Sequence, residues 1–187
     1  WNAKPILIGK TYTSVFGITR SEDGGVVAVG QSSDKLLATT LKGKVDGFLA
    51  KVLNGKVVSV QRSSDVNANR AWRTTSSSLL LGGFSNSSAV ITKFNPNFTP
   101  AWTDRYPSNG TALTSSVGKF HYGAFVSTSA IKALPTWKKK NAILLLTLDS
   151  KGLISGASYV NSTVINGFTA NSTVGPIVLS GGFLYRA

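Results

Sequence analysis

The sequence of 187 residues contains no cysteine, no methionine and only one histidine, His121. Without cysteine there is no disulfide, no thiolate nucleophile and no cysteine-ligated metal. A metal site would have to combine one histidine with scattered carboxylates that show no EF-hand or zinc spacing, so no metal is expected. No cofactor is expected either, because the Gly-Gly pairs lack the strand-to-helix context of a phosphate-binding loop.

Acidic residues are also scarce: seven carboxylates stand against 20 Lys and Arg, for a net charge of +13. Glycosidase chemistry needs two carboxylates at one site, and Glu22, Asp23 and Asp149 sit in patterns typical of turns. A serine hydrolase needs a positioned base. His121 instead lies in the strand-like pattern Phe-His-Tyr-Gly, with no G-x-S-x-G nearby. The sequence therefore predicts no enzyme.

Long apolar runs and helical periodicity are missing as well. No apolar stretch approaches the ~20 residues that span a bilayer, so no membrane span is expected. With 42% hydrophobic residues and 19 glycines, the chain has enough apolar material for a core and enough turn residues for many short strands. We predict a single all-β domain over residues 1–187.

A hairpin-like pattern recurs four times along this chain. Each copy has an apolar run, a short turn and a second apolar or alternating run. Three copies are continuous, and the fourth is split between the two ends of the chain. The copies cover residues 47–62, 89–105, 142–159, and 182–187 continued by 1–10.

A further strand-like stretch ending in glycine precedes each hairpin, with room for one more strand before it. Units of about four strands and 40–50 residues predict the blades of a β-propeller. Pro5 and Pro100 are 95 positions apart, as are Asp46 and Asn141, which predicts a pseudo-twofold repeat. We expect a four-bladed propeller in which about 164–187 and 1–10 form the last blade. A β-sandwich of the same hairpins is the alternative.

The split hairpin requires that the N-terminal strand pair with the C-terminal one, because an unpaired strand exposes a row of backbone groups. Closure within one chain is the favoured arrangement, since the repeat needs no inserted residue at the junction. In the other arrangement, residues 6–8 of one subunit complete the last blade of the next and propagate a filament.

Two longer connections, 32–45 and 128–140, hold seven of the 14 lysines. In a propeller both connections would lie on one face, on opposite blades. Such a face could bind an anionic glycan, a surface layer or a nucleic-acid backbone, although the low arginine content argues against nucleic acid. The same lysines could simply keep the protein soluble. The candidate binding residues are Lys42, Lys44, Trp137, Lys138, Lys139 and Lys140.

Signs of export are present but modest. The chain opens on Trp, which fits removal of a signal peptide. Five Asn-x-Ser/Thr sequons predict N-glycosylation of an exported protein, although turns are commonly rich in the same residues. The sequon asparagines are Asn86, Asn97, Asn109, Asn161 and Asn171.

The repeat units SEDGGVVAVG, DGFLAKVLNGKVVSVQRS and AVITKFNPNFTPAWTDRY resemble those of secreted and surface β-propeller proteins of archaea and bacteria. The third blade departs from the pattern, because Leu146 stands where Lys51 and Lys93 stand in the first two. The resemblance implies the fold and an exported setting, and it supplies no catalytic residues.

These features together predict a non-enzymatic, extracellular structural or adhesive subunit of a cell surface, filament or virion. Its expected partners are other copies of itself, surface glycans or other envelope proteins. The alternative is a lectin-like module that binds anionic glycans through the basic face.

Overall fold

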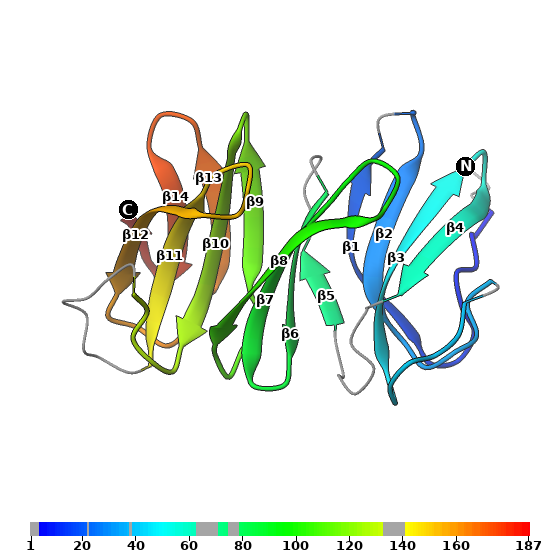
Figure 1. The fold of residues 1–187 in the computed structure, drawn as a ribbon, viewed down its shortest axis with the longest axis horizontal. Coiled ribbons are helices and arrows are strands. Elements are labelled where there is room, and N and C mark those ends of the chain that lie inside the picture. The colour runs from blue at the N-terminus through cyan, green and yellow to red at the C-terminus, as the bar shows by residue number, and fades with distance from the viewer. Residues whose placement is uncertain (1–3, 22, 38, 63–70, 75–78, 133–140) are drawn as a thin grey trace.

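The computed structural model describes residues 4–21, 23–37, 39–62, 71–74, 79–132 and 141–187. This part of the chain is all-β, with fifteen strands in four antiparallel sheets and no helix (Figure 1). No helix long and apolar enough to cross a bilayer occurs among these residues.

Each sheet is a meander in which consecutive strands lie side by side, as short turns require. Sheet 1 contains β1 (Thr13–Arg20), β2 (Val26–Ser32), β3 (Asp46–Leu53) and β4 (Lys56–Arg62). Sheet 2 contains β5 (Ala71–Thr74), β6 (Leu80–Ser85), β7 (Ser88–Phe94) and β8 (Pro100–Pro107). Sheet 3 contains β9 (Leu113–Val117), β10 (Phe120–Ser127), β11 (Ala142–Leu148) and β12 (Ile154–Val160). Sheet 4 contains β13 (Gly167–Asn171), β14 (Gly175–Ser180) and β15 (Phe183–Arg186).

The three continuous hairpins predicted from the sequence are β3–β4, β7–β8 and β11–β12. The turn between β3 and β4 shows why the sequence folds this way. Asn54 and Gly55 both have positive φ, 49° and 73°, which a two-residue hairpin turn matched to strand twist requires. Gly181 and Gly182 do the same between β14 and β15.

Neighbouring sheets pack face to face, and apolar side chains fill the space between them. Leu49 of sheet 1 packs with Leu81 and Val90 of sheet 2. Ile91 of sheet 2 packs with Phe125 and Leu144 of sheet 3, and Ile143 and Leu145 of sheet 3 pack with Val178 of sheet 4. The central strands are therefore buried on both faces.

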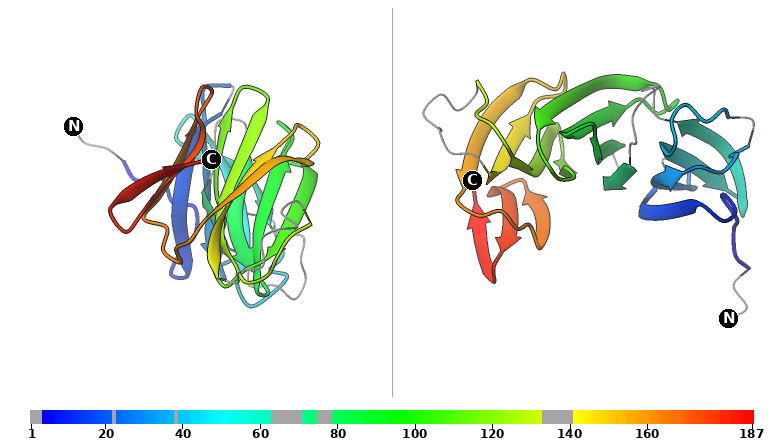
Figure 2. Two further views of the ribbon diagram at one scale, coloured as in Figure 1. Left: turned by 90° about the vertical axis from the view of Figure 1, so that its left-hand side faces the viewer. Right: turned by 90° about the horizontal axis from the view of Figure 1, so that it is seen from below.

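The sheets follow one another along an arc, with their first strands toward its concave side (Figure 2). Contacts join β1 to β5, β5 to β9, and β9 to β13. Sheets 1 and 4 lie at opposite ends of the arc, and so do the two chain termini. The described residues form four stacked sheets, and these residues do not close the stack into a ring.

Sheet 4 has three strands where the others have four. Residues 4–12 form no strand, and β15 pairs only with β14 among the described residues. The fourth strand expected from residues 1–10 is therefore not formed here. The physical reason is local: from Ile8 onward, the N-terminal segment is held against sheet 1, as described below.

A substitution at Gly30 of β2 tests how closely β1 and β2 approach each other. A Cβ atom there would collide with the backbone carbonyl oxygen of Ser14 in β1. We expect Gly30→Ala to lower the free energy of unfolding by about 1–3 kcal/mol, since β1 must shift. Gly110→Ala is the matched control, because a Cβ at Gly110 meets nothing within 4 Å. Urea unfolding that shows equal stability for both variants would contradict this packing.

Candidate assembly site

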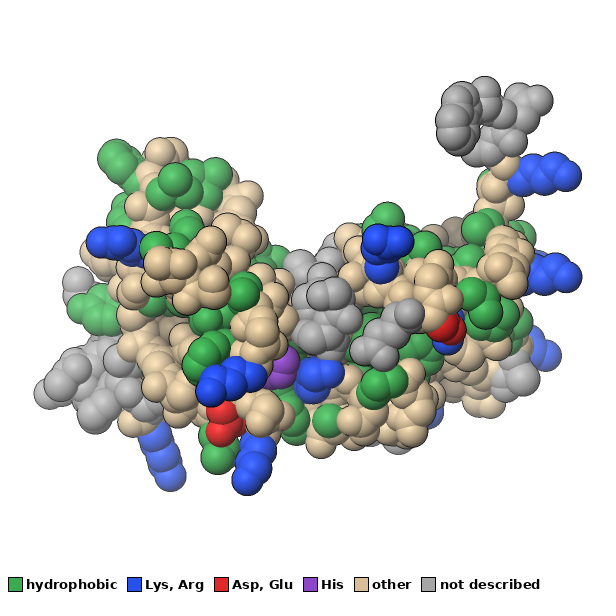
Figure 3. All heavy atoms as spheres, turned by 90° about the horizontal axis from the view of Figure 1, so that it is seen from above, with side chains coloured by type: hydrophobic (Ala, Val, Ile, Leu, Met, Phe, Trp, Pro, Cys, Tyr) green, Lys and Arg blue, Asp and Glu red, His purple; other side chains and the backbone are tan. Residues whose placement is uncertain are grey.

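Among the strands whose burial is described, β15 at the edge of sheet 4 is the one exposed at every residue. Phe183, Leu184 and Tyr185 are 67%, 75% and 37% exposed. The space-filling view shows hydrophobic side chains gathered on the lobe at this end, separated from the N-terminal end by an open gap (Figure 3). An exposed apolar edge strand is a ready template for pairing with another strand.

In the internal repeat, β15 corresponds to β7. The turn at Gly181 follows the turn at Asn86 by 95 residues, the interval already seen between Asp46 and Asn141. Ala89, Val90 and Ile91 in β7 are fully buried, and β8 pairs along that strand. β15 carries residues suited to the same position, but no strand of the described residues lies beside it as β8 lies beside β7.

The N-terminal segment is the counterpart of this open edge. Ile6 and Leu7 are 46% and 76% exposed, whereas Ile8 packs against Leu36 and Phe48 on the outer face of sheet 1. Residues 4–7 therefore project from the fold, and the segment is anchored only from Ile8 onward.

Asp34 anchors the residues that follow Ile8. Its Oδ2 accepts hydrogen bonds from the backbone N–H of Lys10 (2.8 Å) and Tyr12 (3.0 Å) and from the Thr13 hydroxyl (2.7 Å). The Thr13 hydrogen bond, helped by the two amides, lowers the pKa of the Asp34 carboxyl below its usual value. This carboxylate ties the start of the chain to the connection between β2 and β3.

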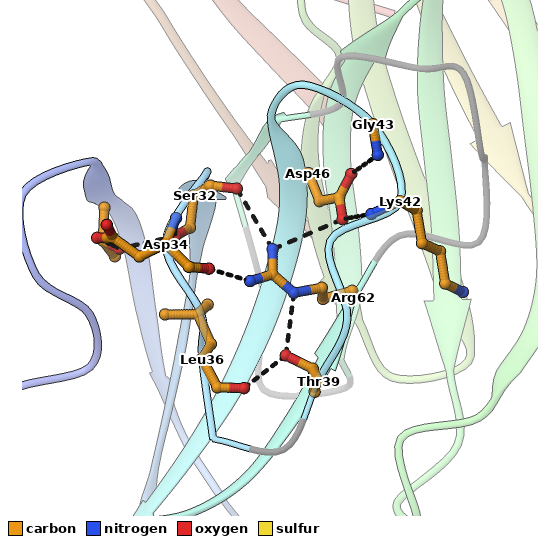
Figure 4. Close-up of polar contacts among 9 residues, drawn as sticks. Ser32, Asp34, Leu36, Thr39, Lys42, Gly43, Asp46 and Arg62 are labelled. Atoms are coloured by element: carbon orange, nitrogen blue, oxygen red, sulfur yellow. Dashed lines mark hydrogen bonds and ion pairs between the residues drawn. The ribbon is translucent and has the colours of Figure 1, made fainter.

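A buried arginine holds the same connection, residues 33–45, to the sheet (Figure 4). The Arg62 guanidinium donates to Thr39 Oγ1 (2.9 Å) and to the carbonyls of Ser32 (3.3 Å) and Asp34. Its Nη1 also lies 3.6 Å from Oδ2 of the fully buried Asp46. The planar guanidinium carries several N–H donors, so one side chain can donate hydrogen bonds to several oxygen atoms of the connection at once.

Asp46 also fixes the basic part of the connection. Its carboxylate oxygens accept from the backbone N–H groups of Lys42 (2.6 Å) and Gly43 (2.8 Å). The side chains of Lys42 and Lys44 are exposed, as a role in binding would need. Trp137, Lys138, Lys139 and Lys140 lie outside the described residues, so a shared face with Lys42 and Lys44 stays a prediction.

All five sequon asparagines are exposed, and they lie at turns or strand ends. Two of them hold their turns through their own side chains: Asn97 Oδ1 accepts from the Thr99 N–H (3.1 Å), and Asn171 Oδ1 accepts from the Thr173 N–H (2.7 Å). The asparagines therefore have the turn role that their sequence context indicates, and their glycosylation stays a prediction.

The lone histidine lies between sheets 2 and 3. His121 Nδ1 is 3.1 Å from Ser116 Oγ, and burial lowers the pKa of the imidazole. No group of three His, Cys, Asp or Glu side chains that could hold a metal occurs in the part of the chain that the structure describes.

Sequence reasoning did not find Asp34 and Arg62, whose roles depend on contacts 16 to 30 residues away along the chain. A signal for Arg62 exists in hindsight: it ends β4, and Asp46 begins the neighbouring strand. Charged residues at the ends of buried strands usually require a partner.

Scans against protein-family models and curated proteins found no match to this chain. Its function is therefore inferred from its own contacts and exposed surfaces.

Arg62→Met tests the buried ion pair. The change leaves the Asp46 carboxylate buried without its cation, which is expected to cost about 3–5 kcal/mol of folding stability. Asp23→Asn is the control, because it removes the exposed Asp23–Lys51 ion pair and should change stability little. A loss in chemical denaturation no greater for Arg62→Met than for this control would contradict the proposed role of Arg62.

Asp104 of β8 supplies a pH-dependent test. Burial raises the pKa of its carboxyl despite a hydrogen bond with Tyr106, and its buried Oδ2 accepts no hydrogen bond from the described residues. The folded state therefore binds this proton more tightly than the unfolded chain. The protonated Asp104 carboxyl therefore favours the folded state. This contribution to stability is fully present below the ordinary pKa of aspartate, and it is lost as the pH rises through the raised pKa of Asp104.

Asp104→Asn keeps the shape of the side chain and removes its charge. It should therefore raise the melting temperature at pH 7 and change it little near pH 3. Thermal unfolding of both proteins across that range measures the difference. A variant that is less stable than the parent at pH 7 would contradict the expected cost of this charge.

Proposed function

We propose that this protein is a non-enzymatic structural subunit of an extracellular assembly, such as a filament, a surface layer or a virion. The observation that carries the proposal is the open apolar edge of sheet 4. Natural edge strands are usually guarded by charges, prolines or bulges. β15 instead presents three consecutive exposed aromatic or aliphatic residues, Phe183, Leu184 and Tyr185. A strand of this composition suits a protein that works with its edge covered by another chain.

We further propose that the subunit is built on a four-bladed β-propeller plan. Adjacent first strands and the apolar layers between successive sheets support this plan. Three sheets have the full four strands of a blade, and only the last lacks one. The plan is completed when sheet 4 receives its missing strand.

An extracellular setting is proposed on the composition of the surface. The five sequon asparagines are all exposed, as glycosylation of an exported protein would require. Exposed Lys42 and Lys44 could add contacts to acidic glycans or envelope proteins, which would make the subunit adhesive as well as structural.

Assembly is tested by sedimentation velocity and electron microscopy over a range of protein concentrations. We expect polymers that grow with concentration. Replacing Phe183 and Leu184 by Lys should reduce assembly at least about tenfold at an unchanged melting temperature, since charged residues block edge pairing. The control is Leu153→Lys, which alters an equally exposed leucine, 65% exposed, at the β11–β12 turn. A protein that stays monomeric at every concentration would overturn the proposed function.

A further inference from the structure

We infer that the stack of sheets continues from one molecule to the next: the outer face of sheet 4 in one copy packs on the β1 part of the outer face of sheet 1 in a second copy. This inference rests on the proposed assembly and names the two surfaces that meet in it. Three observations carry it: the apolar side chains exposed on both faces, their correspondence to residues buried between sheets, and the positions of the two faces in the fold.

The outer face of sheet 1 is apolar and exposed along β1. Ile18 pairs with Ala28, which pairs in turn with Ala50, and directly paired residues share one face of a sheet. Ala50 belongs to the outer cluster around Leu36, so Ile18 also lies on the outer face. By the same register Val15 lies there too. Ile18 and Val15 are 70% and 45% exposed, so the cluster around Leu36 does not cover β1.

The outer face of sheet 4 has a matching apolar patch. Val178 of β14 packs against sheet 3, and successive side chains of a strand point to opposite faces. Leu179 therefore points away from sheet 3, and so does Leu184, with which it pairs. Both leucines are exposed. They form an apolar surface at the end of the stack.

The position of Leu184 is one that the fold covers elsewhere with a sheet. In sheet 2, Phe84 pairs with Ala89. Leu179 and Leu184 follow these two residues by 95 positions each and pair in the same way. Ala89 is fully buried in the layer that joins sheet 2 to sheet 3. Leu184 thus stands where a following sheet would pack.

The position of Ile18 is likewise one that a preceding sheet covers. Thr114 of β9 pairs with Gly123. Ile18 pairs with Ala28, which precedes Gly123 by 95 residues. Thr114 is buried, and its hydroxyl donates to the carbonyl of Leu80 in sheet 2 (3.1 Å). Ile18 thus stands where contact with a preceding sheet is expected.

The positions of the two faces favour a second copy as the occupant. Sheets 1 and 4 lie at opposite ends of the arc, with an open gap between them (Figures 2 and 3). Sheet 3 already packs with one face on sheet 2 and with the other on sheet 4, so the fold makes this kind of contact repeatedly. The intermolecular contact joins two different surfaces, so it is heterologous and propagates head to tail.

Two arginines on these faces give the contact a salt dependence. Arg20 pairs with Val26 on the outer face of sheet 1, and Arg186 pairs with Ile177 on the outer face of sheet 4. Their like charges oppose the contact at low ionic strength, and salt screens this repulsion. Assembly should therefore begin at a lower protein concentration as salt is added, and the opposite trend would overturn the inference.

Two variants that block opposite faces test the contact. Ile18→Lys places a charge on the outer face of sheet 1, and Leu179→Lys places one on the outer face of sheet 4. Each should raise the protein concentration needed for assembly at least about tenfold, because burying an unpaired charge is unfavourable. β14 is paired on both sides, so Leu179→Lys leaves the β15 edge unchanged. Leu153→Lys is again the control and should assemble like the parent.

Mixing the two blocked variants gives the sharpest result. Each variant keeps one unaltered face, so an equimolar mixture should form a 1:1 heterodimer that does not grow, as measured by sedimentation velocity. Contact between two identical faces would instead leave one variant able to assemble alone, which would overturn the inference. Melting temperatures equal to that of the parent show that the variants fold. If Ile18→Lys melts lower, Val15→Lys on the same face takes its place.

The parent protein, measured beside the variants, separates this inference from the proposed function. Polymers of Ile18→Lys and Leu179→Lys that match those of the parent would overturn the inference and leave the proposed function standing. A parent that stays monomeric at every concentration would overturn the two together.

Discussion

The need to cover both faces of every sheet governs this structure. Inner strands such as β3, β7 and β11 are buried on both faces because a sheet packs on each side of them or a loop covers them. A stack of sheets ends in two outer faces, and each sheet among the described residues ends in edge strands. The β3 part of the outer face of sheet 1 is covered by Leu36 and Ile8, whereas β15 of sheet 4 has no cover from the described residues. The proposed assembly follows from this difference.

Polar contacts at the other end of the chain determine which part of the N-terminal segment is free. Arg62 and Asp46 hold the β2–β3 connection in place, and Asp34 in that connection binds the backbone of Lys10 and Tyr12. The buried ion pair thus helps to hold the start of the chain on sheet 1, through the connection that carries Asp34. Loss of this pair would loosen both the connection and the exit direction of residues 4–7.

Local signals made much of the fold predictable. The alternating apolar residues around Asn54-Gly55 indicate the β3–β4 hairpin. The 95-residue interval from Asp46, the first residue of β3, leads to Asn141, the residue before β11. Glycine pairs were harder to interpret, because Gly181 and Gly182 form a turn while Gly82 and Gly83 lie within β6. The partner of the last strand could not be predicted from the sequence, because pairing with the N-terminal segment of the same chain and pairing with that of another chain require the same residues. The anchor at Asp34 joins segments more than 20 residues apart, and no local pattern marks it.

Hydrogen exchange of the β15 amides, followed as protein concentration rises, tests the central claim most directly. Leu184 and Arg186 lie in an edge strand whose amides should exchange rapidly in dilute protein. The account predicts that β15 becomes protected as the subunits assemble. Full protection of β15 in dilute, monomeric protein would show that the strand is supplied within the chain, and lack of protection in the assembled state would show that the edge is not the contact.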